Sequence, residues 1–191
     1  ISLIDFDTIT LARRYRAADF WAVVITITVT LLAGVELGVL AGVGVSVGLH
    51  LYHTSRPHFA VIGQVPNSEH YRNAERHNVV TDPHILSMRI DESLYFANSA
   101  YLEAMVFAQA ALREELAHVI LMCPAVNVID LSALEALEEI NTRLRENNVT
   151  LHLSEVKGPV MDALQRSDFL SHLTGEIFLS HHSAVTALRV K

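Results

Sequence analysis

Apolar residues form one long block followed by a series of short runs, which predicts a chain of two parts. Residues 20–49 read FWAVVITITVTLLAGVELGVLAGVGVSVGL, thirty residues in which Glu36 is the only charged side chain. That is well beyond the ~18 apolar residues that suggest a transmembrane helix. A signal peptide has a shorter apolar core near the start, whereas an arginine-containing segment comes first here. We therefore expect residues 20–49 to be embedded in a membrane or, failing that, to form a deeply buried core.

The charges around this block indicate that it crosses the membrane twice. Basic residues favour the cytoplasmic side, so arginines at both ends predict an even number of crossings. We expect the chain to reverse at Glu36, between Gly34 and Gly38, because glycine weakens a helix and a carboxylate is costly in hydrocarbon. The prediction is two helices, about 20–33 and 37–52. The flanking residues are Arg13, Arg14 and Arg16 before the block, and Arg56, Arg72 and Arg76 after it.

Both predicted helices are shorter than the ~20 residues that a full crossing needs. Short helices expose backbone polar groups at their ends, which lipid tolerates only where other protein covers them, so we expect further membrane segments around them. Small residues four apart also let helix backbones approach closely. Glu36 has a second interpretation, in which it binds or carries an ion rather than lying in the turn. The spaced glycines are Gly34, Gly38 and Gly42, and then Gly44 and Gly48.

Two further segments flank the block. Residues 1–18 mix apolar side chains with acids and arginines, which predicts the end of another spanning helix and then an interfacial helix capped by Asp7. Residues 57–82 contain Pro57, Gly63 and Pro66 and lack periodicity, so we expect a linker that leads out of the membrane. The expected organisation is membrane helices at 1–56, the linker at 57–82 and a separate domain at 83–191.

From residue 83 onward, short apolar runs alternate with amphipathic stretches, the pattern of an α/β domain with a largely parallel sheet. Asp91-Glu92 predicts a tight turn that pairs the first two strands. In the second helix, Leu134, Leu137, Ile140 and Leu144 are predicted to face inward. In the first, the predicted inner face is Tyr101, Met105, Ala108 and Leu112. The expected strands are 84–90, 93–98, 118–130 (interrupted at Pro124), 149–156 and 176–180, and the expected helices are 99–116, 131–146, 158–168 and 182–190.

Composition excludes several kinds of function. A net charge of -7 with scattered basic residues gives no stripe that would neutralise a nucleic acid backbone. Cys123 is the single cysteine and is predicted to be a small buried hydrophobe. The 11 histidines form no ligand motif, so no metal site and no cofactor are expected. There is no nucleophile with a nearby base and no P-loop, and we predict that the chain is not an enzyme.

Two stretches of the second half carry a family resemblance. VIDLSALEALEEI (128–140) and VKGPVMDALQRSDF (156–169) resemble the STAS domain, which anti-sigma-factor antagonists share with the tails of sulfate permease (SulP) anion transporters. Upstream, GVELGVLAGVGVSVGLHLYHTSRPHFAVIGQVPNSEHYRN (34–73) is similar to the last membrane helices of those transporters and their exit into the tail. The order of hairpin, SRP linker and STAS domain makes the match specific.

The resemblance implies a fold and a function. The fold would be an α-helical membrane hairpin, the end of a transporter gate domain, followed by a STAS domain with helices packed on a mixed sheet. The function would be the C-terminal portion of a secondary transporter of sulfate, bicarbonate or dicarboxylates in the bacterial inner (plasma) membrane, with the STAS domain in the cytoplasm. The family's anion site lies mainly in helices absent from this chain, so no substrate-binding residue is expected. The implied partners are the remaining membrane domain, lipid, a second copy of the protein, and a cytosolic protein or nucleotide at the STAS domain.

Asp130 and Ser132 mark the corner where an apolar run turns into a helix, and they have two interpretations. Either side chain could cap the helix by accepting a backbone N–H, and an acid also suits the helix dipole. In antagonist proteins, the matching loop carries a serine that a kinase phosphorylates, which makes Ser132 a candidate regulatory site. Here Leu131 and Ala133 depart from the residues common beside that serine.

One alternative function stays open from the sequence. A membrane hairpin could tether a self-contained STAS signalling module that binds a kinase, a nucleotide or a carrier protein. The chain begins at Ile1 rather than at a methionine, so we expect it to be part of a longer protein. Further hydrophobic spans upstream would favour the transporter, whereas a start codon close to Ile1 would favour the tether.

Overall fold

The computed structural model describes residues 17–189. The interfacial helix and the Asp7 cap predicted for residues 1–18 therefore lie almost entirely outside the described residues. The chain forms two compact units, which divide between Thr54 and Ser55. Each unit is described by itself below.

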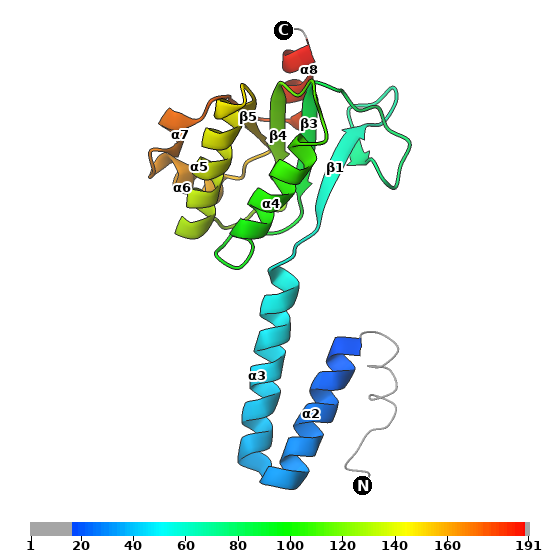
Figure 1. Ribbon diagram of the computed structural model, residues 1–191, viewed down its shortest axis with the longest axis vertical. Coiled ribbons are helices and arrows are strands. Elements are labelled where there is room, and N and C mark those ends of the chain that lie inside the picture. Colours follow the sequence, from blue (N-terminus) through cyan, green and yellow to red (C-terminus); the bar gives the residue numbers. More distant parts are fainter. Residues whose placement is uncertain (1–16, 190–191) are drawn as a thin grey trace. The chain divides into compact units, whose positions relative to one another are not determined.

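The first unit is a hairpin of two helices, α2 (Ala17–Ala33) and α3 (Val35–Thr54), shown in Figure 1. A single residue joins them, Gly34, whose φ of 94° lies in the left-handed region that glycine adopts without strain. The chain therefore reverses two residues before Glu36, and the predicted turn at Glu36 is wrong. Glu36 lies instead in the first turn of α3, where the positive end of the helix dipole favours an acid.

Helix α3 is longer than the sequence pattern predicted. It spans Val35–Thr54, 20 residues, whereas the expected range was 37–52. By length and composition it can cross a membrane. The prediction that both helices are half-length is therefore wrong for α3. Because one glycine makes the turn, the residues on either side of it remain available to the helices. The apolar part of α2, Phe20–Ala33, is shorter than a full span.

The second unit contains a six-stranded sheet in the order β2-β1-β3-β4-β5-β6. Strands β3 to β6 are parallel, and β1 runs antiparallel to both β2 and β3, so the sheet is mixed. A helical part followed by an α/β domain with a mixed sheet is confirmed. The strands are β1 (Phe59–Gln64), β2 (Tyr71–Asn73), β3 (Ile85–Ile90), β4 (His118–Met122), β5 (Thr150–Ser154) and β6 (Ile177–Phe178).

Strand β1 corrects two predictions. Residues 57–82 are not a linker, because β1 and β2 lie within them and belong to the sheet. Residues 93–98 do not pair with 84–90 as a hairpin, since β1 occupies the edge of β3 where that hairpin would form. Pro57 and Gly63 flank or interrupt the apolar run of β1, and this concealed the strand in the sequence pattern.

The predicted strand 118–130 ends early. Strand β4 stops at Met122, and residues 123–130 form a loop that touches residues 93–98 through an isolated bridge between Leu94 and Ile129. Proline cannot donate a ladder hydrogen bond, and Pro124 lies directly after the point where the strand ends.

The helices of this unit cover both faces of the sheet. Helices α4 to α7 share the larger core with the side chains of Leu86, Val119 and Leu151, and α8 covers the other face over Ile85 and Ile120. Neighbouring positions along each strand thus point to opposite faces. The helices are α4 (Ser99–Ala110), α5 (Leu131–Glu146), α6 (Gly158–Gln165), α7 (Phe169–His172) and α8 (His181–Arg189).

The sequence pattern predicted α5 correctly but placed the end and the inner face of α4 wrongly. Helix α5 has the predicted bounds, with Leu137, Ile140 and Leu144 buried and Leu134 partly buried. Helix α4 ends at Ala110 rather than near residue 116, and its buried residues are Leu102 and Val106. Leu112, predicted to face inward, is 75% exposed. The actual inner face is shifted by one residue, which the nearly uniform apolar character of this helix concealed.

Candidate functional site

The corner that joins β4 to α5 lies at the carboxyl edge of the parallel strands. Loop 91–98 follows β3 and loop 123–130 follows β4, so both emerge at this edge. Strand β1 is antiparallel to β3, and its first residue, Phe59, pairs with Ile90 at the end of β3. The chain therefore enters the sheet unit at the same edge that carries the Asp130 corner.

Asp130 caps helix α5. Its backbone is extended, with φ of -98° and ψ of 179°, and its Oδ1 atom accepts a hydrogen bond from the backbone N–H of Ala133 at 2.9 Å. This is the usual geometry of an N-terminal cap, and the negative charge also suits the helix dipole. Of the two capping candidates in the sequence, the structure assigns the role to Asp130.

The same carboxylate holds a second segment. Its Oδ2 atom accepts a hydrogen bond from the backbone N–H of Phe96 at 2.8 Å. The backbones also pair nearby, because Leu94 donates to Val128 at 3.0 Å and Asp130 donates to Leu94 at 3.2 Å. Asp130 thus joins loop 93–98 to the start of α5.

Asn98 orders loop 93–98 from inside. Its side chain is fully buried, its Nδ2 donates to the carbonyl of Ser93 at 2.9 Å, and its Oδ1 accepts from the N–H of Tyr95 at 3.0 Å. Asn98 precedes α4, but its side chain makes no cap hydrogen bond to that helix. It bonds back to the preceding loop, and this contact could not be predicted from spacing alone.

Ser132 lies two residues after the cap, in the first turn of α5, and is partly exposed. Its hydroxyl makes no hydrogen bond to any residue that the structure describes. Asp130, and not Ser132, therefore caps α5. Phosphorylation of Ser132 stays a prediction.

Three apolar side chains of the two segments that meet at this corner are exposed to solvent. Phe96 is 65% exposed, Val128 60% and Leu131 70%, and we call them the apolar rim. The rim has a polar neighbour in Lys157, from the loop before α6, whose Nζ donates to Asn127 Oδ1 at 2.7 Å. Exposed apolar residues grouped around an ordered corner are typical of a binding surface. The sequence showed these residues only as parts of apolar runs.

The hairpin residues singled out in the sequence have different roles. Gly34 makes the turn, Glu36 is exposed, and Gly38 is buried. A Cβ atom at Gly38 would overlap Thr30, and one at Gly42 would lie 2.8 Å from Oγ1 of Thr26. Glycine at these two positions therefore permits the close approach of α2 and α3, as the spacing predicted.

The second glycine pair lies elsewhere. A Cβ at Gly44 or Gly48 would meet nothing within 4 Å among the described residues. These positions therefore do not pack against α2. The Glu36 side chain makes no ion pair or hydrogen bond within residues 17–189. Its interpretation as an ion-binding residue stays a prediction.

Burial shifts the pKa of two ionisable groups of the sheet unit, Cys123 and His181. Burial raises the pKa of the Cys123 thiol to about 12, so the thiolate that could react is suppressed. His181 is buried between Ser154 and Ser87, with its ring nitrogens 2.9 and 3.0 Å from their hydroxyl oxygens, and burial lowers its pKa to about 4. Across the described range 17–189, no group of three His, Cys, Asp or Glu side chains is placed to hold a metal ion.

Comparison with known proteins identifies the family. The family model of the STAS domain matches residues 76–184. The chain belongs to the STAS domain family. It is 32% identical over 195 residues to "Sulfate transporter 4.1, chloroplastic" of Arabidopsis thaliana, and 33% identical over 199 residues to "Sulfate transporter 3.1" of the same plant.

Those alignments cover 96% and 98% of this chain but only 28% and 30% of the two transporters. The chain thus spans less than a third of the length of these relatives. The fold of a murine Solute Carrier 26 family member A9 anion transporter, solved in the inward-facing state, superimposes with a TM-score of 0.87 at 20% identity. That match covers 97% of this chain and 31% of the other. The resemblance to the C-terminal part of SulP transporters, membrane helices followed by a STAS domain, is confirmed.

Proposed function

We propose that this chain is the C-terminal portion of a secondary-active transporter of anions, of the sulfate, bicarbonate or dicarboxylate class. The observation that carries the proposal is the direct passage from an apolar helix into the STAS sheet. Helix α3 ends at Thr54 and β1 begins at Phe59, so only four residues separate a helix long enough to span a membrane from the first strand. Two sulfate transporters of Arabidopsis thaliana align with 96% and 98% of this chain, including this junction, which supports a transporter over a tethered module.

The membrane hairpin supports the same proposal through its surface. Large apolar side chains along α2 and α3 are exposed, among them Leu31, Leu32, Val35 and Leu40. In a membrane, such side chains face lipid or the small residues of neighbouring helices. We propose that the remaining membrane domain of the transporter packs here, and that the substrate site lies in that domain rather than in residues 1–191. The protein would lie in a bacterial inner membrane with the STAS domain in the cytoplasm.

For the STAS domain we propose regulation, folding support and contacts between two copies of the transporter. The apolar rim and Ser132 form the surface that suits regulation, because a partner bound to the rim would also touch the serine. Phosphorylation of Ser132 would add a charge of about -1.5 to -2 at the first turn of α5, beside the carboxylate of Asp130. The helix dipole would favour that charge, whereas Asp130 would oppose it.

The test is uptake of radiolabelled sulfate, bicarbonate and succinate by liposomes that contain the full-length protein. We expect saturable uptake of at least one anion. A variant that lacks residues 55–191 should show reduced uptake or reduced assembly, because the boundary between the two units lies at residue 55. Failure of correctly folded full-length protein to move any of these anions would favour the alternative, a tethered STAS module that binds a kinase, a nucleotide or a carrier protein.

A further inference from the structure

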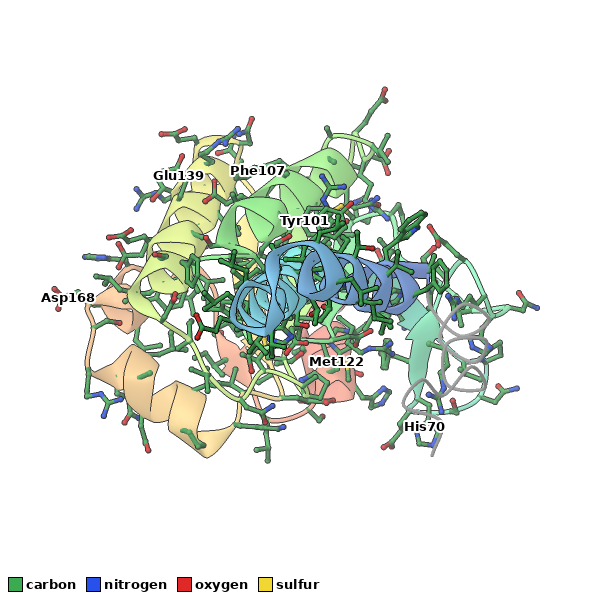
Figure 2. The ribbon with its side chains drawn as sticks, turned by 90° about the horizontal axis from the view of Figure 1, so that it is seen from below. His70, Tyr101, Phe107, Met122, Glu139 and Asp168 are labelled. Carbon is green, nitrogen blue, oxygen red and sulfur yellow. The ribbon has the colours of Figure 1, made fainter. Side chains whose placement is uncertain are left out.

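A second surface of the STAS domain lies at the amino-terminal ends of the parallel strands, whereas the Asp130 corner lies at their carboxyl ends. It is a pocket of about 360 Å³ between the end of α4, the loop before β4 and the last turn of α5. Figure 2 labels Phe107 on α4 and Glu139 on the adjacent α5. The pocket's apolar walls include Phe107, Leu116 and Val149, and its charged residues are Arg113, Glu114 and Arg143.

The guanidinium of Arg143 is held against an aromatic wall of this pocket. Its central carbon lies 3.8 Å from the centroid of the Phe107 ring, a cation–π contact. Its only other partner within the described chain is Glu139, whose carboxylate is 4.0 Å away and about half exposed. A solvated pair at that distance is weak, so most of the N–H donors of Arg143, which is half exposed, are open to solvent or to a ligand.

Arg113 is the stronger indication of a ligand. Its side chain is partly buried, its Nη1 donates to the carbonyl of Gln109 at 2.6 Å, and burial lowers its pKa. Within residues 17–189 it has no carboxylate partner. A guanidinium has five N–H donors, and removing it from water without an opposite charge is unfavourable. An anion in the pocket would compensate for that loss.

We propose that this pocket binds a small organic oxyanion, a carboxylate, phosphate or sulfonate carried on a short apolar or aromatic body. Arg113 and Arg143 would hold the oxyanion, since guanidinium donors match the geometry of such groups. Phe107, Leu116 and Val149 would contact the apolar body. The volume is within the range of small-molecule sites. Glu114, an exposed residue that lines the pocket, would weaken the binding of any anion through its negative charge.

The test uses phenyl phosphate as the probe and the full chain in lipid nanodiscs, with binding measured by calorimetry against empty nanodiscs. We expect saturable binding of phenyl phosphate, and binding at least about tenfold weaker for phenol and for inorganic phosphate, because each lacks one half of the ligand. Arg113→Gln should weaken binding by about tenfold or more through loss of a charge-assisted hydrogen bond.

Two variants make the test independent of folding and of net charge. Glu114→Gln changes an exposed residue and should tighten binding several-fold, because it removes the opposing charge. Arg145→Gln removes one positive charge from α5, the helix that carries Arg143, but from outside the pocket, and binding should stay within about twofold. The proposal is overturned if wild-type protein shows no saturable binding, if Arg113→Gln binds as well as wild type, if Arg145→Gln weakens binding as much as Arg113→Gln, or if inorganic phosphate binds as tightly as phenyl phosphate.

Discussion

The carboxylate of Asp130 accepts a hydrogen bond from the backbone N–H of Phe96, 34 residues earlier in the chain, with 2.8 Å between Oδ2 and the nitrogen. The other oxygen of the same group caps α5 through Ala133. One side chain therefore ties a loop that follows β3 to the helix that follows β4. The position of the apolar rim, and hence any partner surface at this corner, depends on this carboxylate.

Replacing Asp130 should weaken the STAS domain measurably. Asp130→Ala loses a helix cap, worth about 1 kcal/mol, and leaves the N–H of Phe96 without its acceptor, which costs about 1 kcal/mol more. We expect the free energy of unfolding to fall by about 2 kcal/mol in urea titrations followed by circular dichroism. Asp130→Asn keeps a capping oxygen and should lose less. Equal losses in the two variants would show that the cap geometry is not what stabilises the corner.

Ser132→Ala should leave stability almost unchanged. The hydroxyl makes no hydrogen bond within the described residues, so the free energy of unfolding should stay within about 0.5 kcal/mol of wild type. If Ser132 is a regulatory site, Ser132→Asp should alter anion uptake or partner binding while Ser132→Ala melts at the wild-type temperature. A fall of 1 kcal/mol or more in Ser132→Ala would contradict the assignment of the cap to Asp130.

The stability of the STAS domain should depend on His181 in acid. The pKa of His181 is lowered from 6.5 to about 4 in the folded domain, so between these pH values the unfolded chain binds the proton more tightly. The contribution of this residue is therefore complete above pH 6.5 and is lost as the pH falls toward 4, to a total of about 3 kcal/mol.

The comparison that isolates this effect is between wild type and His181→Gln. We expect His181→Gln to be less stable at pH 7.5, because the contacts with Ser154 and Ser87 change. The difference between the two proteins should shrink as the pH falls from 6.5 to 4, measured by urea titration at each pH. A constant difference across that range would mean that His181 titrates normally in the folded domain.

Bulk at Gly38 should open the membrane hairpin. Gly38→Ile places a side chain where a Cβ alone would overlap Thr30, and overpacking of this kind costs about 1–3 kcal/mol. Spin labels at the exposed positions Ile25 and Val47 should report longer distances between α2 and α3. Gly48→Ile is the matched control on the same helix, since the position is open, and its distances should match those of wild type.

Several features could be predicted from local patterns because their causes are local. The 3.6-residue period of Leu137, Ile140 and Leu144 defined α5 to the residue, with an acid before it and Asn147 after it. The thirty-residue apolar block likewise indicated a membrane hairpin, since its length and lack of charge are properties of the chain itself.

Other features depend on contacts between distant segments. The six residues of β1 become a strand because β3 offers a free edge, and that pairing keeps residues 93–98 out of the sheet. Local spacing alone could not separate Asp130 from Ser132 as the cap, or place the buried side chain of His181 between Ser87 and Ser154.

The sequence by itself determined the two-part organisation, the main helices and the family resemblance, because periodicity, apolar length and short motifs are all written along the chain. Only the tertiary structure decided that Asp130 holds Phe96 and that Arg113 and Arg143 line one pocket. Hydrogen bonding and the burial of charge depend on which segments meet, and residues far apart in the chain meet only when the sheet and its helices have packed.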